Sequence, residues 1–149
     1  MTVMARLRVL LPALWAGVLL CIALVATPAP FATLTPADAG RVVGRIFAQE
    51  AYFSLVVAVA LFLMERRIAA ADAAAGRGSA MSTNVLLLLG TLFCTVAGYF
   101  ALQPLMAAAR AGQGGPSFAV LHGVSAGFFG LKTVLVCALS WRTARPSAL

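Results

Sequence analysis

Charged residues are scarce in this chain of 149 residues: only 10% are Asp, Glu, Lys or Arg, and only four are acidic. Soluble domains usually have about a quarter of their residues charged. Hydrophobic residues make up 62% of the sequence, and the mean hydropathy is +1.00. A water-soluble fold of this length could not bury so much apolar surface, so we expect a single transmembrane domain over 1–149, with the lipid bilayer as its main partner.

Histidine and cysteine are also rare. The chain has one histidine and three cysteines (Cys21, Cys94 and Cys137), all within apolar stretches and without a C-x-x-C pair. This pattern argues against a disulfide framework or a structural zinc site. One histidine and three deep cysteines give no ligand set with metal-like spacing, and a haem held by two histidines would need a second chain. We therefore expect no metal and no cofactor.

The net charge of +7 could indicate nucleic-acid binding, but its distribution does not. Ten of the eleven basic residues are arginines, in short tracts between long apolar runs. This arrangement is typical of topology signals beside membrane spans, whereas nucleic-acid binding needs a basic face. We expect no nucleic-acid partner.

Four apolar stretches are long enough to cross a bilayer, which takes about 20 mainly apolar residues in a helix. They cover residues 9–27, 46–64, 84–106 and 117–141. Strands that cross membranes are shorter and alternate polar with apolar residues. The sequence therefore predicts an all-α integral membrane four-helix bundle, and no internal repeat stands out in it.

The connecting segments differ in character. The run Thr27-Pro28-Ala29-Pro30 predicts the end of the first helix, because proline interrupts the helical ladder. Thr35, Pro36 and Asp38 favour a helix start, so the second helix should begin near residue 36 and continue into the membrane. Residues 65–83, low in complexity, predict a mobile cytoplasmic loop.

The positions of the arginines predict the orientation. One side of the predicted bundle carries Arg6, Arg8, Arg66, Arg67, Arg77, Arg142 and Arg145, and the other carries Arg41, Arg45 and Arg110. Both termini should therefore lie in the cytoplasm. An alternative for the N-terminus is a cleavable signal peptide, but its apolar run is long and no small-x-small site precedes Pro28.

Polar residues inside the spans are the candidate site, because titratable groups there are costly. Glu50, Gln103 and His122 are predicted near the outer face, and we expect Glu50 to hold His122 through a ring N–H. Three interpretations stay open: a structural clamp, a site for a proton, ion or small ligand, and contact with lipid headgroups. Lys132 either extends toward the cytoplasmic headgroups or faces a polar interior with Ser125.

Glycines on the last two spans predict close helix packing. Gly90 and Gly98 lie on the third span, and Gly123, Gly127 and Gly130 lie on the fourth. Small residues at such spacings let helix backbones approach closely in lipid, within one bundle or between protomers.

The segment from Gly123 to Gly127 matches the G-x-S-x-G pattern of hydrolase nucleophiles. That motif needs a strand–turn–helix context, whereas here it falls inside a predicted spanning helix. The only histidine is its immediate neighbour, so we expect that the chain is not an enzyme.

Several segments together resemble bacterial members of the transmembrane protein 205-like family, also described as DUF4149. They are residues 11–17 (LPALWAG), 29–31 (APF), 39–52 (AGRVVGRIFAQEAY), 103–106 (QPLM) and 121–125 (LHGVS). The resemblance implies a four-helix bundle of the bacterial inner membrane with no established activity, and places Glu50, Gln103, His122 and Ser125 at recurrent polar positions. Relatives are expected to carry an acidic or amide residue near Lys132, so a lysine there weakens a proton- or cation-handling role for that region.

The sequence therefore favours a small membrane protein with a polar site near the periplasmic face, acting as a structural or interaction component, as a homo-oligomer or within a larger membrane complex. The alternative is a small transporter or exporter that binds a proton, ion or small solute through Glu50 and His122.

Overall fold

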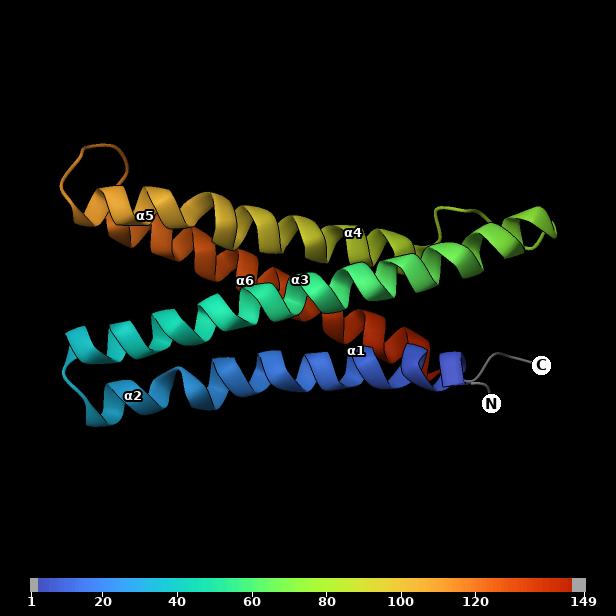
Figure 1. The fold of residues 1–149 in the computed structure, drawn as a ribbon, viewed down its shortest axis with the longest axis horizontal. Helices are drawn as coiled ribbons and strands as arrows, with labels where there is room; N and C mark the ends of the chain where they lie inside the picture. Colours follow the sequence, from blue (N-terminus) through green and yellow to red (C-terminus); the bar gives the residue numbers. More distant parts are fainter. Residues whose placement is uncertain (1–2, 146–149) are drawn as a thin grey trace.

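Two helical hairpins make up the fold, and each pairs an interrupted helix with a long continuous one (Figure 1). In the first hairpin, α1 (Val3–Cys21), the π-helical turn η1 (Ile22–Ala26) and α2 (Pro28–Thr33) are followed by α3 (Pro36–Ala74). In the second, α4 (Thr83–Thr95), the π-helical turn η2 (Val96–Ala101) and α5 (Leu102–Arg110) are followed by α6 (Phe118–Ala144). The computed structural model describes residues 3–145.

The two ends of the bundle are distinct. The start of α1 and the end of α6 lie at one end in Figure 1, together with the connection between α3 and α4, and we call this the terminal end. The opposite end, called the distal end, holds the short connection between α2 and α3 and the loop between α5 and α6. The helices α1 and α4 both run toward the distal end, and α3 and α6 both return.

The contacts between helices form a ring. The helix α1 packs on α3 and α6, and α4 packs on the same two helices. Thus α3 and α6 occupy opposite corners of the bundle. Toward the distal end, α2 packs on α3 and α5 packs on α6, so each hairpin closes on itself.

The two hairpins repeat each other in structure, although the sequence shows no repeat. Each π-helical turn lies just before a proline, Pro28 or Pro104. Proline lacks the N–H that continues the helical ladder, and a π turn accommodates that break. The long helices start alike, because Thr35 and Ser117 both cap them by accepting a hydrogen bond from a backbone N–H three residues later.

Two predicted boundaries are wrong. The helix does not end at Thr27-Pro28, because η1 leads into α2 and helical structure continues to Thr33. Residues 65–74, predicted as part of a loop, are the end of α3, and only residues 75–82 connect α3 to α4. Half of this stretch is alanine and it also contains Glu and Arg, and all three residue types are strong helix formers. The predicted start of the second helix near residue 36 is confirmed.

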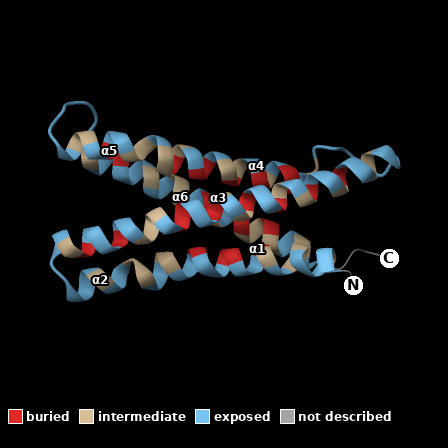
Figure 2. Cartoon of the chain, in the orientation of Figure 1, coloured by how far each residue is buried: buried red, intermediate tan, exposed pale blue. Residues whose placement is uncertain are grey.

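The apolar core lies in the terminal half of the bundle, where Trp15, Leu61, Leu88 and Val136 are at most 1% exposed. Figure 2 shows exposed positions along the outward sides of all the long helices. Many of these exposed side chains are large and apolar, for example Leu24, Val56, Phe93 and Val134. Such surfaces are rare on soluble proteins. The described residues contain four helices long and apolar enough to cross a membrane.

Candidate functional site

A buried ion pair joins the two hairpins near the middle of the bundle. Lys132 on α6 donates from Nζ to Oε1 of Glu50 on α3 at 2.6 Å, and their side chains are 3% and 2% exposed. The two residues stand at equivalent positions on their helices. Glu50 follows the N-cap Thr35 by fifteen residues, and Lys132 follows the N-cap Ser117 by fifteen residues. The pair therefore forms across the diagonal of the bundle, between equivalent positions of the two hairpins.

A short chain of hydrogen bonds connects this ion pair to α1. The indole N–H of Trp15 donates to Ser54 Oγ at 2.9 Å, and Ser54 donates in turn to Glu50 Oε1. Trp15 and Ser54 are both fully buried. An indole N–H buried among apolar side chains needs an acceptor, because leaving it unpaired is costly. Three of the four long helices thus converge on one carboxylate.

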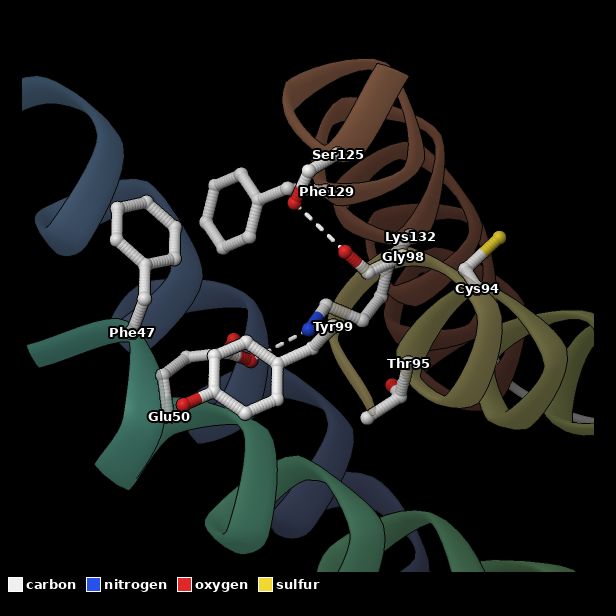
Figure 3. Close-up of a pocket in the computed structure, with 9 residues that line it drawn as sticks. All are labelled: Phe47, Glu50, Cys94, Thr95, Gly98, Tyr99, Ser125, Phe129 and Lys132. Atoms are coloured by element: carbon white, nitrogen blue, oxygen red, sulfur yellow. Dashed lines mark hydrogen bonds and ion pairs between the residues drawn. The ribbon is translucent and has the colours of Figure 1, made fainter. Parts of the chain in front are cut away.

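A small cavity of about 20 Å³ adjoins the ion pair, with Cys94, Thr95 and Tyr99 among its lining residues (Figure 3). This volume is enough for about one water molecule. Figure 3 shows Glu50 and Lys132 pointing toward each other from α3 and α6. The rings of Phe47 and Phe129 meet edge to face beside them, with centroids 5.0 Å apart.

A much larger cavity, of about 880 Å³, lies between the two hairpins at the distal end, and we call it the distal cavity. Its volume falls within the roughly 300–1,000 Å³ typical of small-molecule sites. One wall comes from α2 and α3, and the other from η2, α5 and α6. Phe47, Phe129, Tyr99 and Ser125 line both cavities, so these side chains separate the distal cavity from the ion pair.

The walls of the distal cavity follow the structural repeat. Five equivalent positions on the two long helices line it, 1, 5, 8, 9 and 12 residues after each N-cap: Pro36 and Phe118, Gly40 and His122, Val43 and Ser125, Gly44 and Ala126, Phe47 and Phe129. Thr27 and Gln103, which precede Pro28 and Pro104, also line it from the two sides. The cavity is therefore an interface between two repeats.

The predicted pairing of Glu50 with His122 is wrong. Glu50 pairs with Lys132, whereas His122 lines the distal cavity and stacks on Phe118. The prediction that Lys132 extends toward the headgroups is also wrong, because its side chain is buried and bonded to Glu50. The alternative, that it faces a polar interior, is the one observed.

The other predicted polar residues divide between the two cavities. Gln103 lines the distal cavity with His122, apart from the ion pair. Ser125 borders both cavities and donates from Oγ to the carbonyl oxygen of Gly98 at 2.6 Å. The G-x-S-x-G segment lies inside α6, as expected.

The predicted packing glycines fall into two groups. A Cβ at Gly90 would lie 3.0 Å from the Leu135 side chain, and one at Gly98 would overlap Phe128, so these two glycines permit the contact between α4–η2 and α6. A Cβ at Gly123, Gly127 or Gly130 would meet no atom of the described chain within 4 Å. These three glycines therefore do not pack within one bundle.

Sequence reasoning missed a second polar cluster near the terminal end. Glu65 on α3 accepts from Arg8 of α1 through two guanidinium nitrogens, one at 3.0 Å, and from Asn84 of α4 at 3.0 Å. Arg142 of α6 donates to Asn84 Oδ1 at 2.9 Å. Hydrogen bonds thus link all four long helices in one cluster around the Glu65 carboxylate, with α6 joined to it through Asn84. The signal in the sequence is Glu65 itself, an acid at the end of an apolar run.

The four long apolar helices indicate a multi-pass membrane protein, and the described residues contain no group of three or more His, Cys, Asp or Glu placed to hold a metal ion. The model of the family described as Domain of unknown function (DUF4149) matches residues 10–114, more than half of the chain, so the chain belongs to this family. The matched region includes Glu50 and Gln103, whereas His122, Ser125 and Lys132 lie beyond it. No curated protein and no solved structure matches the chain.

Proposed function

We propose that this chain is a small membrane carrier, a transporter or exporter without enzymatic activity, that binds its ligand in the distal cavity. The observation that carries the proposal is the position of the cavity. It lies between two structural repeats, and four side chains at its floor separate it from a buried ion pair that joins them. Many membrane transporters bind substrate at the interface between internal repeats, near the middle of the membrane.

The closed side of the cavity supports a gating role for the ion pair. Beyond Glu50 and Lys132, the apolar core fills the terminal half of the bundle, and the Glu65 cluster ties its four helices together. A ligand in the distal cavity therefore has a path to one side only. A carrier would need a second arrangement in which the hairpins close at the distal end and separate at the terminal end.

The interrupted helices supply places for such a movement. The π-helical turns η1 and η2 lie in the distal half of their hairpins, and each is followed by a proline. Such turns weaken the regular ladder and are frequent at functional sites. We propose that the hairpins bend there.

The membrane setting is part of the same proposal. Seven arginines on the terminal side against three on the distal side favour cytoplasmic termini in a bacterial inner membrane, with the distal cavity facing the periplasm. We also propose a relationship to transmembrane protein 205-like proteins, which is supported by the segments that resemble them.

A second candidate function is a structural or interaction component that acts as a homo-oligomer or in a larger membrane complex. It is supported by Gly123, Gly127 and Gly130, which form an open face of small residues on α6. Small residues at such spacings commonly mediate helix association in membranes. In this alternative, the Glu50–Lys132 pair only stabilises the bundle.

Distance measurements between spin labels separate the two candidates. With the three native cysteines replaced by alanine, one pair of labels is placed at exposed Leu34 and Gln113 of the distal end, and another at exposed Arg6 and Ser79 of the terminal end. For a carrier, we expect Glu50→Gln to shift the distal distances shorter and the terminal distances longer, because it weakens the bond that holds the hairpins in this arrangement. Thr133→Val, which removes a hydroxyl bonded only within α6, is the control.

The opposite result is equally informative. If each label pair gives one distance that Glu50→Gln and Lys132→Gln leave unchanged, the bundle is rigid. The carrier proposal would then be wrong, and the structural component would be the better account.

A further inference from the structure

We propose that the ligand of the distal cavity is an anionic phospholipid, held by its phosphate against Arg41 and Arg110 and by an acyl chain along the aromatic floor. The inference rests on the proposed function, since it names the class of ligand for the same cavity. Three observations carry it: the charge of the walls, the largely apolar floor and the apolar outward sides of the hairpins that form the cavity.

The charge of the walls is of one sign. Arg41 of α3 and Arg110 of α5 line the cavity from its two sides, whereas none of the described residues that line it is Asp or Glu. Arginine binds phosphate through paired N–H donors, and such charge-assisted hydrogen bonds are stronger than neutral ones. A cationic or zwitterionic headgroup gains less from these walls than an anionic one.

One of the two arginines is held in place by a stack of side chains. The guanidinium of Arg110 lies 4.4 Å from the centroid of the Phe118 ring, and the Phe118 ring is stacked with His122, with centroids 5.6 Å apart. Cation–π contact and stacking fix the direction of the guanidinium before a ligand arrives. The other arginine, Arg41, forms an ion pair with Asp38, but 76% of its side chain is exposed and its remaining donors are available.

The deeper part of the cavity is largely apolar. Phe47, Met106 and Phe129 line it between the arginines and the ion pair, and Tyr99 and Ser125 add two hydroxyl groups at its floor. A free inorganic anion would bind the arginines but would leave the apolar side chains of the floor exposed to water. An acyl chain covers it and removes that apolar surface from water, which is favourable.

The helices that form the cavity carry apolar side chains on their outward sides. The cavity lies between hairpins whose outward sides carry exposed apolar side chains, such as Val120 on α6 and Val42 on α3. In a bilayer these outward sides would face lipid, and we propose that a phospholipid enters the cavity between them without leaving the membrane. Its headgroup then lies at the level of the helix ends that carry Arg41 and Arg110, where phosphates of the leaflet also lie.

Native mass spectrometry of the full chain in detergent tests the proposal. The probes are phosphatidylglycerol, which is anionic, phosphatidylethanolamine with the same acyl chains, which is zwitterionic, and inorganic phosphate. We expect one phosphatidylglycerol to bind with at least tenfold preference over phosphatidylethanolamine, and phosphate alone not to compete. Equal binding of the two lipids, or displacement of phosphatidylglycerol by millimolar phosphate, would overturn the proposal.

Two variants with matched controls locate the bound lipid. Arg110→Gln should lower the affinity for phosphatidylglycerol about tenfold, whereas Arg67→Gln, which removes an exposed arginine outside the cavity, should not. Gly44→Phe should abolish one-to-one binding, because Gly44 lines the cavity and a side chain there meets open space. Gly17→Phe on α1, also open but outside the cavity, should leave binding intact.

Equal losses in the variants and their controls would show that lipid binds the surface at large, and would refute the assignment to the cavity. That failure would be distinguishable from a failure of the carrier proposal. The spin-label experiment does not depend on added lipid. A bundle that moves but shows no lipid preference would therefore support the carrier proposal and reject only the lipid as its ligand.

Discussion

Glu50 and Lys132 form an ion pair across the diagonal of the bundle, from equivalent positions on the two long helices. Each residue comes from a different structural repeat, so the bond joins the two hairpins just beyond the floor of the distal cavity. The strength and geometry of this ion pair therefore affect both the stability of the bundle and the movement of the hairpins relative to each other.

Removing one partner of this pair should be strongly destabilising. Lys132→Met leaves a buried carboxylate, and Glu50→Gln leaves a buried ammonium, each costing about 3–5 kcal/mol because the remaining charge is neither hydrated nor neutralised. The double variant Glu50→Gln/Lys132→Met should recover most of that loss, since no buried charge remains. Thermal unfolding in detergent measures all three proteins. A double variant as unstable as the singles would show that charge burial is not the cause.

Exchanging the two charges tests the structural repeat. Because Glu50 and Lys132 follow their N-caps by the same number of residues, Glu50→Lys/Lys132→Glu should place the same two charges in contact with their positions reversed. We expect stability above that of either single variant but below that of the natural protein, since Ser54 would no longer donate to the carboxylate from one turn away. A double-mutant cycle with no positive coupling between the two exchanges would contradict this.

The hydroxyl of Ser54 should matter more than its size suggests. It accepts from the Trp15 indole and donates to Glu50, so Ser54→Ala leaves a buried N–H unpaired and should cost about 1–3 kcal/mol. Thr133→Ala is the matched control, because that hydroxyl donates only to the Phe129 carbonyl of its own helix. The control should change the free energy of unfolding by less than about 0.5 kcal/mol. Similar losses in both variants would refute the bridging role.

The second polar cluster offers a comparison between a buried and an exposed acid. Glu65 is buried and accepts from α1 and α4, whereas Asp72 forms an ion pair with Arg77 at the exposed end of α3. Glu65→Gln should lower the free energy of unfolding by about 2–3 kcal/mol, since it weakens hydrogen bonds to a charged group. Asp72→Asn should cost about 0–1 kcal/mol, as exposed ion pairs do. Chemical denaturation of both variants under one condition checks the difference, and equal effects would contradict it.

The four apolar helices could be predicted from the sequence because hydropathy is a local property that accumulates along each stretch. The end of the first helix could not, since Pro28 allows the chain either to stop or to continue through a π-helical turn, and packing of α2 on α3 decides between them. The low complexity of residues 65–74 predicts a loop, but the helix-forming tendency of alanine continues α3 through this stretch.

In the candidate site, the partner predicted for Glu50 from the sequence is wrong. Matching residues by depth from the start of each apolar run paired Glu50 with His122. Counting from the N-caps Thr35 and Ser117 instead pairs Glu50 with Lys132, so the signal was present in the sequence. The link to Trp15 could not be derived in this way, because it depends on how α1 is rotated against α3, and an almost uniformly apolar helix leaves that rotation undetermined.

The glycines of α6 and η2 give the last prediction, since they separate packing within one bundle from packing between bundles. Gly98→Ala should destabilise the bundle by about 1–3 kcal/mol, because the new methyl group would overlap Phe128. Gly127→Leu should leave the bundle folded, since that position is open within the chain. If the open glycine face mediates association between protomers, the same variant should lower the oligomeric mass measured by light scattering in detergent. An unchanged mass in Gly127→Leu, together with a natural protein that is oligomeric, would place the contact between protomers on another face.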